Sequence, residues 1–202
     1  MEVDRHFLPL IHWLARLAAL FSILSGGVVL WGWNVDDVSL KSFMHSAQVA
    51  THPLVAVEFI LAGSALLLLR AEPLSRWRRW AGTALGAAVL LSAVIKIIGY
   101  QYDDLWERDI DTWLFYFKLG GYRMSPNAAF SFLLIGLALM LLDVKVRGCY
   151  YLPQICVLSA TAAGLLSMSS YFHNVLLLYG ISGLVPAVPD TATVFLILCF
   201  GV

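Results

Sequence analysis

Six apolar runs constrain the fold of this chain more than any other feature of its sequence. Most of them approach the ~20 residues that a helix needs to cross the hydrocarbon core of a bilayer. The runs cover Phe7 to Trp33, Pro53 to Leu69, Trp80 to Tyr100, Pro126 to Leu142, Leu152 to Phe172, and Pro189 onward. Hydrophobic residues make up 60% of the 202 positions and charged residues only 13%. The sequence therefore predicts an all-α membrane protein with six transmembrane helices.

The charges predict an orientation for these helices. The short connections after the second and fourth runs, with the N-terminal segment, carry eight of the thirteen Lys and Arg residues. The longer connections on the opposite side carry eight of the thirteen acidic residues together with many Trp and Tyr residues. By the positive-inside rule, the N-terminus and the basic side are expected in the cytoplasm. We expect lipid to surround the helices and no nucleic-acid partner.

An internal repeat links the second, fourth and sixth apolar runs. Each begins with a proline, which suits the first turn of a helix because its missing N–H has no partner there. The matching positions are Pro53, Pro126 and Pro189; Ala56, Ala129 and Ala192; Phe59, Phe132 and Phe195; and Gly63, Gly136 and, breaking the pattern, Cys199. The repeat predicts three helical hairpins of like topology, at about 1–73, 74–146 and 147–202.

The last of these helices is short. From Pro189 to Val202 a helix rises only about 20 Å, less than the ~30 Å of the hydrocarbon core. We therefore expect this helix to be truncated and to continue toward the cytoplasm. Repeats of one orientation also argue against a transporter, whose repeats are commonly inverted in the membrane plane.

A longer motif carries a resemblance to a known family. The seventeen residues from Arg123, read as RMSPNAAFSFLLIGLAL, resemble the RMSPNTALAFLLLGLAL signature in the membrane regions of bacterial sensor histidine kinases and diguanylate cyclases. The resemblance implies a multi-pass sensory input domain in the bacterial inner membrane, a homodimer, and a cytoplasmic output domain in the same chain. It also implies that this segment is not itself an enzyme, although the full-length protein could be a kinase or a cyclase.

Three histidines on the predicted external side suggest a second function, that of a b-type haem protein for redox sensing or electron transfer. His45, His52 and His173 fall outside the repeat pattern, and Met44 adds a thioether beside His45. Neutral imidazoles are ligands for haem iron, copper or zinc, and a thioether suits copper. Each histidine is equally explained as a hydrogen-bonded side chain at the membrane interface, so both interpretations stay open.

Two charges lie inside apolar runs, at similar depth below the external side. Glu58 is five residues after Pro53, and Lys96 is four residues before Tyr100. Ionisable groups within a membrane usually face the bundle interior and mark a functional site, although Lys96 could instead extend toward the interface. If they converge with the external histidines, they form a ligand pocket. Its predicted walls are Trp31, Trp33, Tyr100 and Tyr171.

Overall fold

The computed structural model describes residues 7–41, 50–70, 75–100, 124–142, 152–172 and 189–202, apart from the side chains of 7–10, 38, 170–172 and 189. Within these ranges the chain forms seven helices and no strand, which confirms the predicted all-α class. The helices are α1 (Phe7–Val35), α2 (Val38–Lys41), α3 (Pro53–Leu69), α4 (Arg76–Gly99), α6 (Pro126–Leu141), α7 (Leu152–Phe172) and α9 (Pro189–Gly201). Each of the six apolar runs largely coincides with one helix, α1, α3, α4, α6, α7 or α9.

Local sequence explains where these helices begin. Ser75 and Ser125 cap α4 and α6, since each hydroxyl accepts a hydrogen bond from the backbone N–H three residues later, at 3.3 Å. Such caps satisfy donors that the first helical turn leaves without intrahelical partners. Ser75 also explains why α4 begins at Arg76, four residues before its apolar run.

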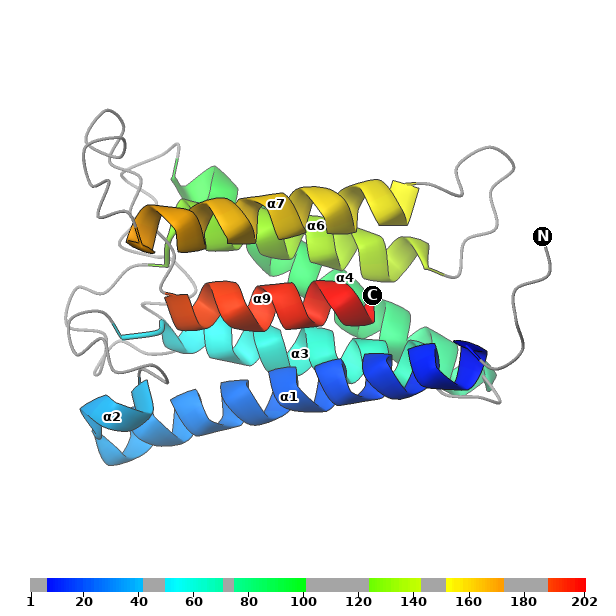
Figure 1. Cartoon of the computed structure of the whole chain (residues 1–202), viewed down its shortest axis with the longest axis horizontal. Helices are drawn as coiled ribbons and strands as arrows, with labels where there is room; N and C mark the ends of the chain where they lie inside the picture. The colour runs from blue at the N-terminus through cyan, green and yellow to red at the C-terminus, as the bar shows by residue number, and fades with distance from the viewer. Residues whose placement is uncertain (1–6, 42–49, 71–74, 101–123, 143–151, 173–188) are drawn as a thin grey trace.

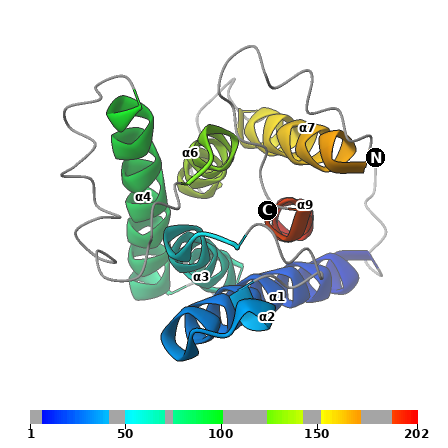
Figure 2. The same ribbon diagram turned by 90° about the vertical axis from the view of Figure 1, so that its left-hand side faces the viewer.

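The helices form an inner and an outer set. Figures 1 and 2 show α3, α6 and α9 enclosed among α1, α4 and α7. Phe59, Phe132 and Phe195, at matching positions of the sequence repeat, meet where the inner helices converge, with ring centroids 4.6 to 5.1 Å apart. Edge-to-face and tilted rings at this separation attract one another beyond the gain from burial alone. These three rings close the centre of the bundle.

Glycine allows two of the inner helices to approach the outer ones closely. A Cβ added to Gly63 would lie 2.7 Å from the carbonyl oxygen of Ala19 on α1. A Cβ added to Gly136 would lie 2.7 Å from the backbone nitrogen of Leu90 on α4. Small residues at such contacts are typical of membrane helices, which associate mainly through close packing.

The outer helices have the length and surface of membrane segments. Ile11–Val35, Arg76–Gly99 and Leu152–Ser169 are long and apolar enough to cross a bilayer, whereas Pro53–Leu69, Pro126–Leu141 and Asp190–Gly201 are shorter apolar helices. Large hydrophobic side chains are exposed on all three outer helices, among them Leu24, Leu91, Leu158 and Leu166. Apolar exposure on this scale is unfavourable in water and is expected against lipid. The fold is that of a membrane protein.

Candidate functional site

The two charges that stand out in the sequence are both buried in the bundle. Glu58 on α3 is 0% exposed and Lys96 on α4 is 2% exposed. The Ser92 hydroxyl on α4 shares its one proton between two acceptors, Oε1 of Glu58 at 2.6 Å and the carbonyl oxygen of Val89 at 2.9 Å. The structure therefore connects α3 and α4 through a buried carboxylate.

Lys96 lies on the same side of α4 as Ser92. The two residues are four positions apart, a spacing that places side chains one above the other on a helix. Since Ser92 reaches Glu58, this side of α4 faces α3, and Lys96 is buried there. The bond from Ser92 to Glu58 depends on how α3 and α4 face each other. We call Glu58, Ser92 and Lys96 the buried polar cluster.

A buried carboxylate and a buried ammonium are costly to keep in a low-dielectric interior. Their ionised forms are stable there only with partners that replace water. The hydroxyl of Ser92 supplies one such bond to Glu58. Ionisable groups in such a position commonly take part in proton uptake and release or in ligand binding.

Trp33 belongs to a different structure, at the corner where α1, α2 and the start of α3 meet. Its Nε1 donates a hydrogen bond of 2.8 Å to the carbonyl oxygen of Thr51, and the Lys41 ammonium lies 4.6 Å from its ring centroid. Lys41 also pairs with Asp36, and its carbonyl oxygen accepts a bond of 3.0 Å from the Thr51 N–H. Trp33 and Lys41 therefore join the α1–α2 corner to Thr51, two residues before the start of α3.

The other predicted pocket walls differ in their surroundings. The Tyr100 hydroxyl donates a 2.8 Å hydrogen bond to the carbonyl oxygen of Met124, which joins the end of α4 to the start of α6. Trp31 is 62% exposed on α1 and so lies on the outside of the bundle. Tyr171 is within α7, but its side chain lies outside the described part of the structure. Trp31 and Trp33 thus have opposite environments although only one residue separates them.

His52 is the N-cap of α3. Its Nδ1 accepts a hydrogen bond of 3.2 Å from the backbone N–H of Leu54, and the residue is 5% exposed. A neutral imidazole whose Nδ1 accepts a bond carries its proton on Nε2, so neither nitrogen offers a lone pair to a metal in this arrangement. The cap accounts for the position of Nδ1 at the start of α3.

The remaining candidate ligands, His45, Met44 and His173, lie outside the described residues. Within the described ranges, no group of three or more His, Cys, Asp or Glu residues is placed to hold a metal ion. Haem, copper and zinc binding therefore stay predictions from the sequence.

Comparison of the chain with protein-family models, with curated proteins and with solved structures finds no match. The resemblance to bacterial sensor membrane regions is thus an expectation carried by the motif from Arg123 onward.

Proposed function

We propose that this chain is the membrane-embedded sensory input domain of a bacterial signal-transduction protein, in which the buried polar cluster takes part in sensing. The fold underlying the proposal has six transmembrane helices in three like-oriented pairs, α1 with α3, α4 with α6 and α7 with α9. Support for the pairing comes from the shared proline, alanine and phenylalanine positions of the inner helices. A homodimer and a cytoplasmic kinase or cyclase domain are part of the same proposal, through the sequence motif.

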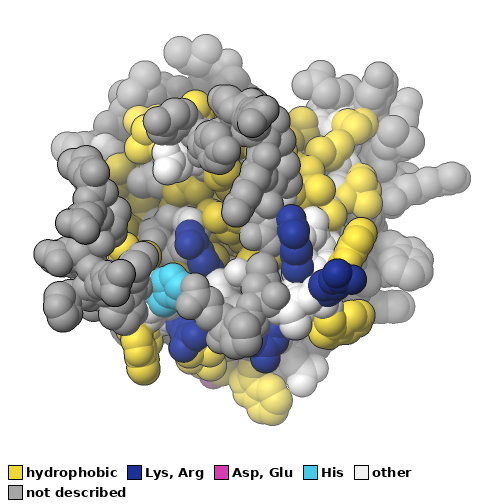
Figure 3. All heavy atoms as spheres, turned by 90° about the vertical axis from the view of Figure 1, so that its right-hand side faces the viewer, with side chains coloured by type: hydrophobic (Ala, Val, Ile, Leu, Met, Phe, Trp, Pro, Cys, Tyr) yellow, Lys and Arg dark blue, Asp and Glu magenta, His cyan; other side chains and the backbone are white. Residues whose placement is uncertain are grey.

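The distribution of charge supports the orientation of the proposed domain. Arg70 ends α3, and Arg76, Arg78 and Arg79 begin α4, so these cations gather at one end of the bundle. Figure 3 shows Lys and Arg side chains at this end. Asp36, Asp37 and Asp190 lie at the opposite end, where α1 finishes and α9 begins. The basic end faces the cytoplasm by the positive-inside rule.

The observation that carries the proposal is the fully buried Glu58 and its bond to Ser92. Glu58 is adjacent in the chain to Phe59, whose ring contacts Phe132 on α6 and Phe195 on α9. A change of proton or ligand at Glu58 would alter the α3–α4 contact and, through Phe59, the position of α9. Because α9 runs toward the basic end, its movement would reach a cytoplasmic output domain.

Packing at the centre of the bundle favours sensing over transport. Phe59, Phe132 and Phe195 are each at most 2% exposed and fill the space between the inner helices. A transport pathway along this axis would require the rings to separate, with loss of their mutual contacts.

A reporter fusion tests the sensory role. The chain is joined after Val202 to a cytoplasmic cyclase domain, and cyclic dinucleotide is measured in cells for the wild type, Glu58→Gln and Lys96→Met. We expect output to change by at least about fivefold in both variants. This fold-change corresponds to the lower end of typical allosteric coupling free energies. Thr83→Ala, on the exposed side of α4, is the control and leaves output unchanged. Equal output from all four proteins, at equal amounts in the membrane, contradicts the proposal.

A further inference from the structure

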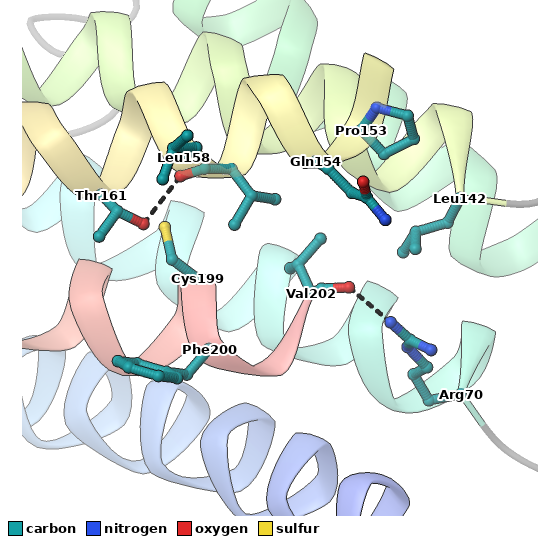
Figure 4. Close-up of a pocket in the computed structure, with 10 residues that line it drawn as sticks. Arg70, Leu142, Pro153, Gln154, Leu158, Thr161, Cys199, Phe200 and Val202 are labelled. Atoms are coloured by element: carbon teal, nitrogen blue, oxygen red, sulfur yellow. Dashed lines mark hydrogen bonds between the residues drawn. The ribbon is translucent and has the colours of Figure 1, made fainter. Parts of the chain in front are cut away.

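A cavity lies at the basic end of the bundle, away from the buried polar cluster. It has a volume of about 540 Å³ and lies between α7 and α9, beside the ends of α3 and α6. Figure 4 shows its lining. The size is within the roughly 300–1,000 Å³ typical of small-ligand pockets.

The cavity occurs where the sequence repeat breaks. Cys199 replaces the glycine found at the matching positions of α3 and α6, and its side chain points toward Thr161 on α7 (Figure 4). A Cβ on Gly164 of α7 would lie 3.6 Å from the nearest side-chain atom of Leu196, an ordinary contact. In the second pair, a Cβ on Gly136 of α6 would lie only 2.7 Å from the backbone nitrogen of Leu90 on α4. The third helix pair is thus packed less closely than the second, which leaves room for a ligand.

The polar groups of the cavity are concentrated at one end. Arg70 is the C-cap of α3, and Gln154 is in the first turn of α7, so both lie at the basic end of the bundle. One Arg70 Nη donates a hydrogen bond to the carbonyl oxygen of Val202. The Arg70 Nε is buried and, among the described residues, has no hydrogen-bond partner. A buried donor without an acceptor is costly, and it indicates a missing oxygen ligand at this point.

The rest of the lining is largely apolar and open toward lipid. Val157, Leu158 and Phe200 line the cavity further from its polar end. Leu158 is 71% exposed and Phe200 is 89% exposed, so the cavity opens on the outer surface of the bundle. From Gln154 to Thr161 the apolar wall extends about 10 Å along α7. An amphiphile with a negatively charged head fits this arrangement.

We propose that the cavity binds an anionic phospholipid from the leaflet at the basic end of the bundle. Its phosphate accepts hydrogen bonds from the Arg70 guanidinium and the Gln154 amide, and one acyl chain lies between α7 and α9. Arginine is suited to this role because its planar guanidinium donates several hydrogen bonds to phosphate oxygens. The site does not depend on the proposed sensory role, because it rests on other residues and another pair of helices.

Lipid binding to the purified chain tests the proposal. Native mass spectrometry after exchange into micelles compares dioleoyl phosphatidylglycerol with dioleoyl phosphatidylcholine, which share their acyl chains. We expect phosphatidylglycerol to bind about tenfold more tightly, because the choline ammonium beside the phosphate of phosphatidylcholine is repelled by Arg70 and the other cations of the basic end. Equal binding of the two lipids overturns the proposal.

Two variants with a matched control locate the site. Arg70→Gln should remove the preference for phosphatidylglycerol, whereas Arg76→Gln, at an exposed position of the same end, should retain it. Cys199→Phe fills the cavity and should weaken binding of both lipids. Unchanged lipid binding in Arg70→Gln or in Cys199→Phe overturns the assignment.

A competition experiment distinguishes a bound lipid from bound inorganic phosphate. Inorganic phosphate at millimolar concentration should leave the bound phosphatidylglycerol in place, since it lacks the acyl chain. Displacement of the lipid by inorganic phosphate would assign Arg70 to a free anion and overturn the proposal. If Arg70→Gln does not fold, Arg70→Lys retains the charge but lacks the Nε donor and the planar guanidinium, and a smaller preference for phosphatidylglycerol than in the wild type is expected; an unchanged preference would overturn the assignment.

Discussion

Glu58 shows how far single residues can be interpreted from the sequence. Charges in apolar runs left two positions open for Glu58 and Lys96, the bundle interior and the external interface, and both residues are buried in the bundle. The bond from Ser92 to Glu58 could not be predicted, because it depends on which faces of α3 and α4 meet. The same limit applies to Trp31 and Trp33, since sequence alone does not tell which of two nearby aromatic residues turns inward.

Removing the Ser92 hydroxyl should destabilise the fold. In Ser92→Ala, Oε1 of the buried Glu58 loses a donor at 2.6 Å, and we expect a loss of about 1–3 kcal/mol in the free energy of unfolding. Unfolding by SDS titration in mixed micelles measures it. Thr83→Ala is the control, because the Thr83 hydroxyl is at a more exposed position and bonds to the carbonyl of Arg79 on its own helix; it should change stability by less than about 0.5 kcal/mol. An equal loss of unfolding free energy in both variants would show that the bond to the buried Glu58 stabilises the fold no more than an exposed hydroxyl bond does.

His52 distinguishes a helix cap from a metal ligand. As a cap it should be replaceable by asparagine, a preferred N-cap residue, whereas His52→Ala should cost about 0.5–2 kcal/mol of unfolding free energy. The same titration measures both variants, and the absorption spectrum of each is recorded. A Soret band in the wild type that disappears in His52→Asn would identify His52 as a haem ligand instead.

At the scale of elements, proline residues indicated most clearly where helices begin. Pro53 and Pro126 predicted the first residues of α3 and α6, because proline fits the first turn and the residue before each acts as a cap. The start of α4 was less predictable, since Arg76 to Arg79 are helical although they are not apolar. Hydrophobicity thus identified each helix, while capping determined where it begins.

Close helix contacts at glycine can be tested with a matched pair of substitutions. In Gly136→Ala the new methyl group meets the backbone of Leu90, so α4 and α6 must separate, at a cost of about 1–3 kcal/mol. Gly27→Ala introduces the same group where no atom lies within 4 Å, and the better helix propensity of alanine should stabilise the protein by up to about 1 kcal/mol. Opposite signs in the SDS titration are expected. A loss of the same size in both variants would contradict the close α4–α6 contact.

At the scale of the whole molecule, the repeat predicted three hairpins but not which of their helices lie inside. The three proline-first helices form the inner set, and their matching phenylalanines meet at the centre. The cavity between α7 and α9 could not be predicted, because the replacement of glycine by Cys199 shows only that the pattern breaks and not how far the helices separate. A departure from a repeat therefore marked a site whose shape required the three-dimensional structure.

The central claim is that six helices cross the bilayer as three like-oriented pairs, and cysteine accessibility tests it most directly. In a chain without its native cysteines, single cysteines replace Asp37, Arg78, Asp111 and Lys145, each in or beside one of the first four connections. We expect the cysteines at 37 and 111 to react with an impermeant thiol reagent in intact spheroplasts, and those at 78 and 145 only after permeabilisation. Reaction of the cysteine at 78 from the outside, together with that at 37, would show that α3 does not cross the membrane and would contradict the account.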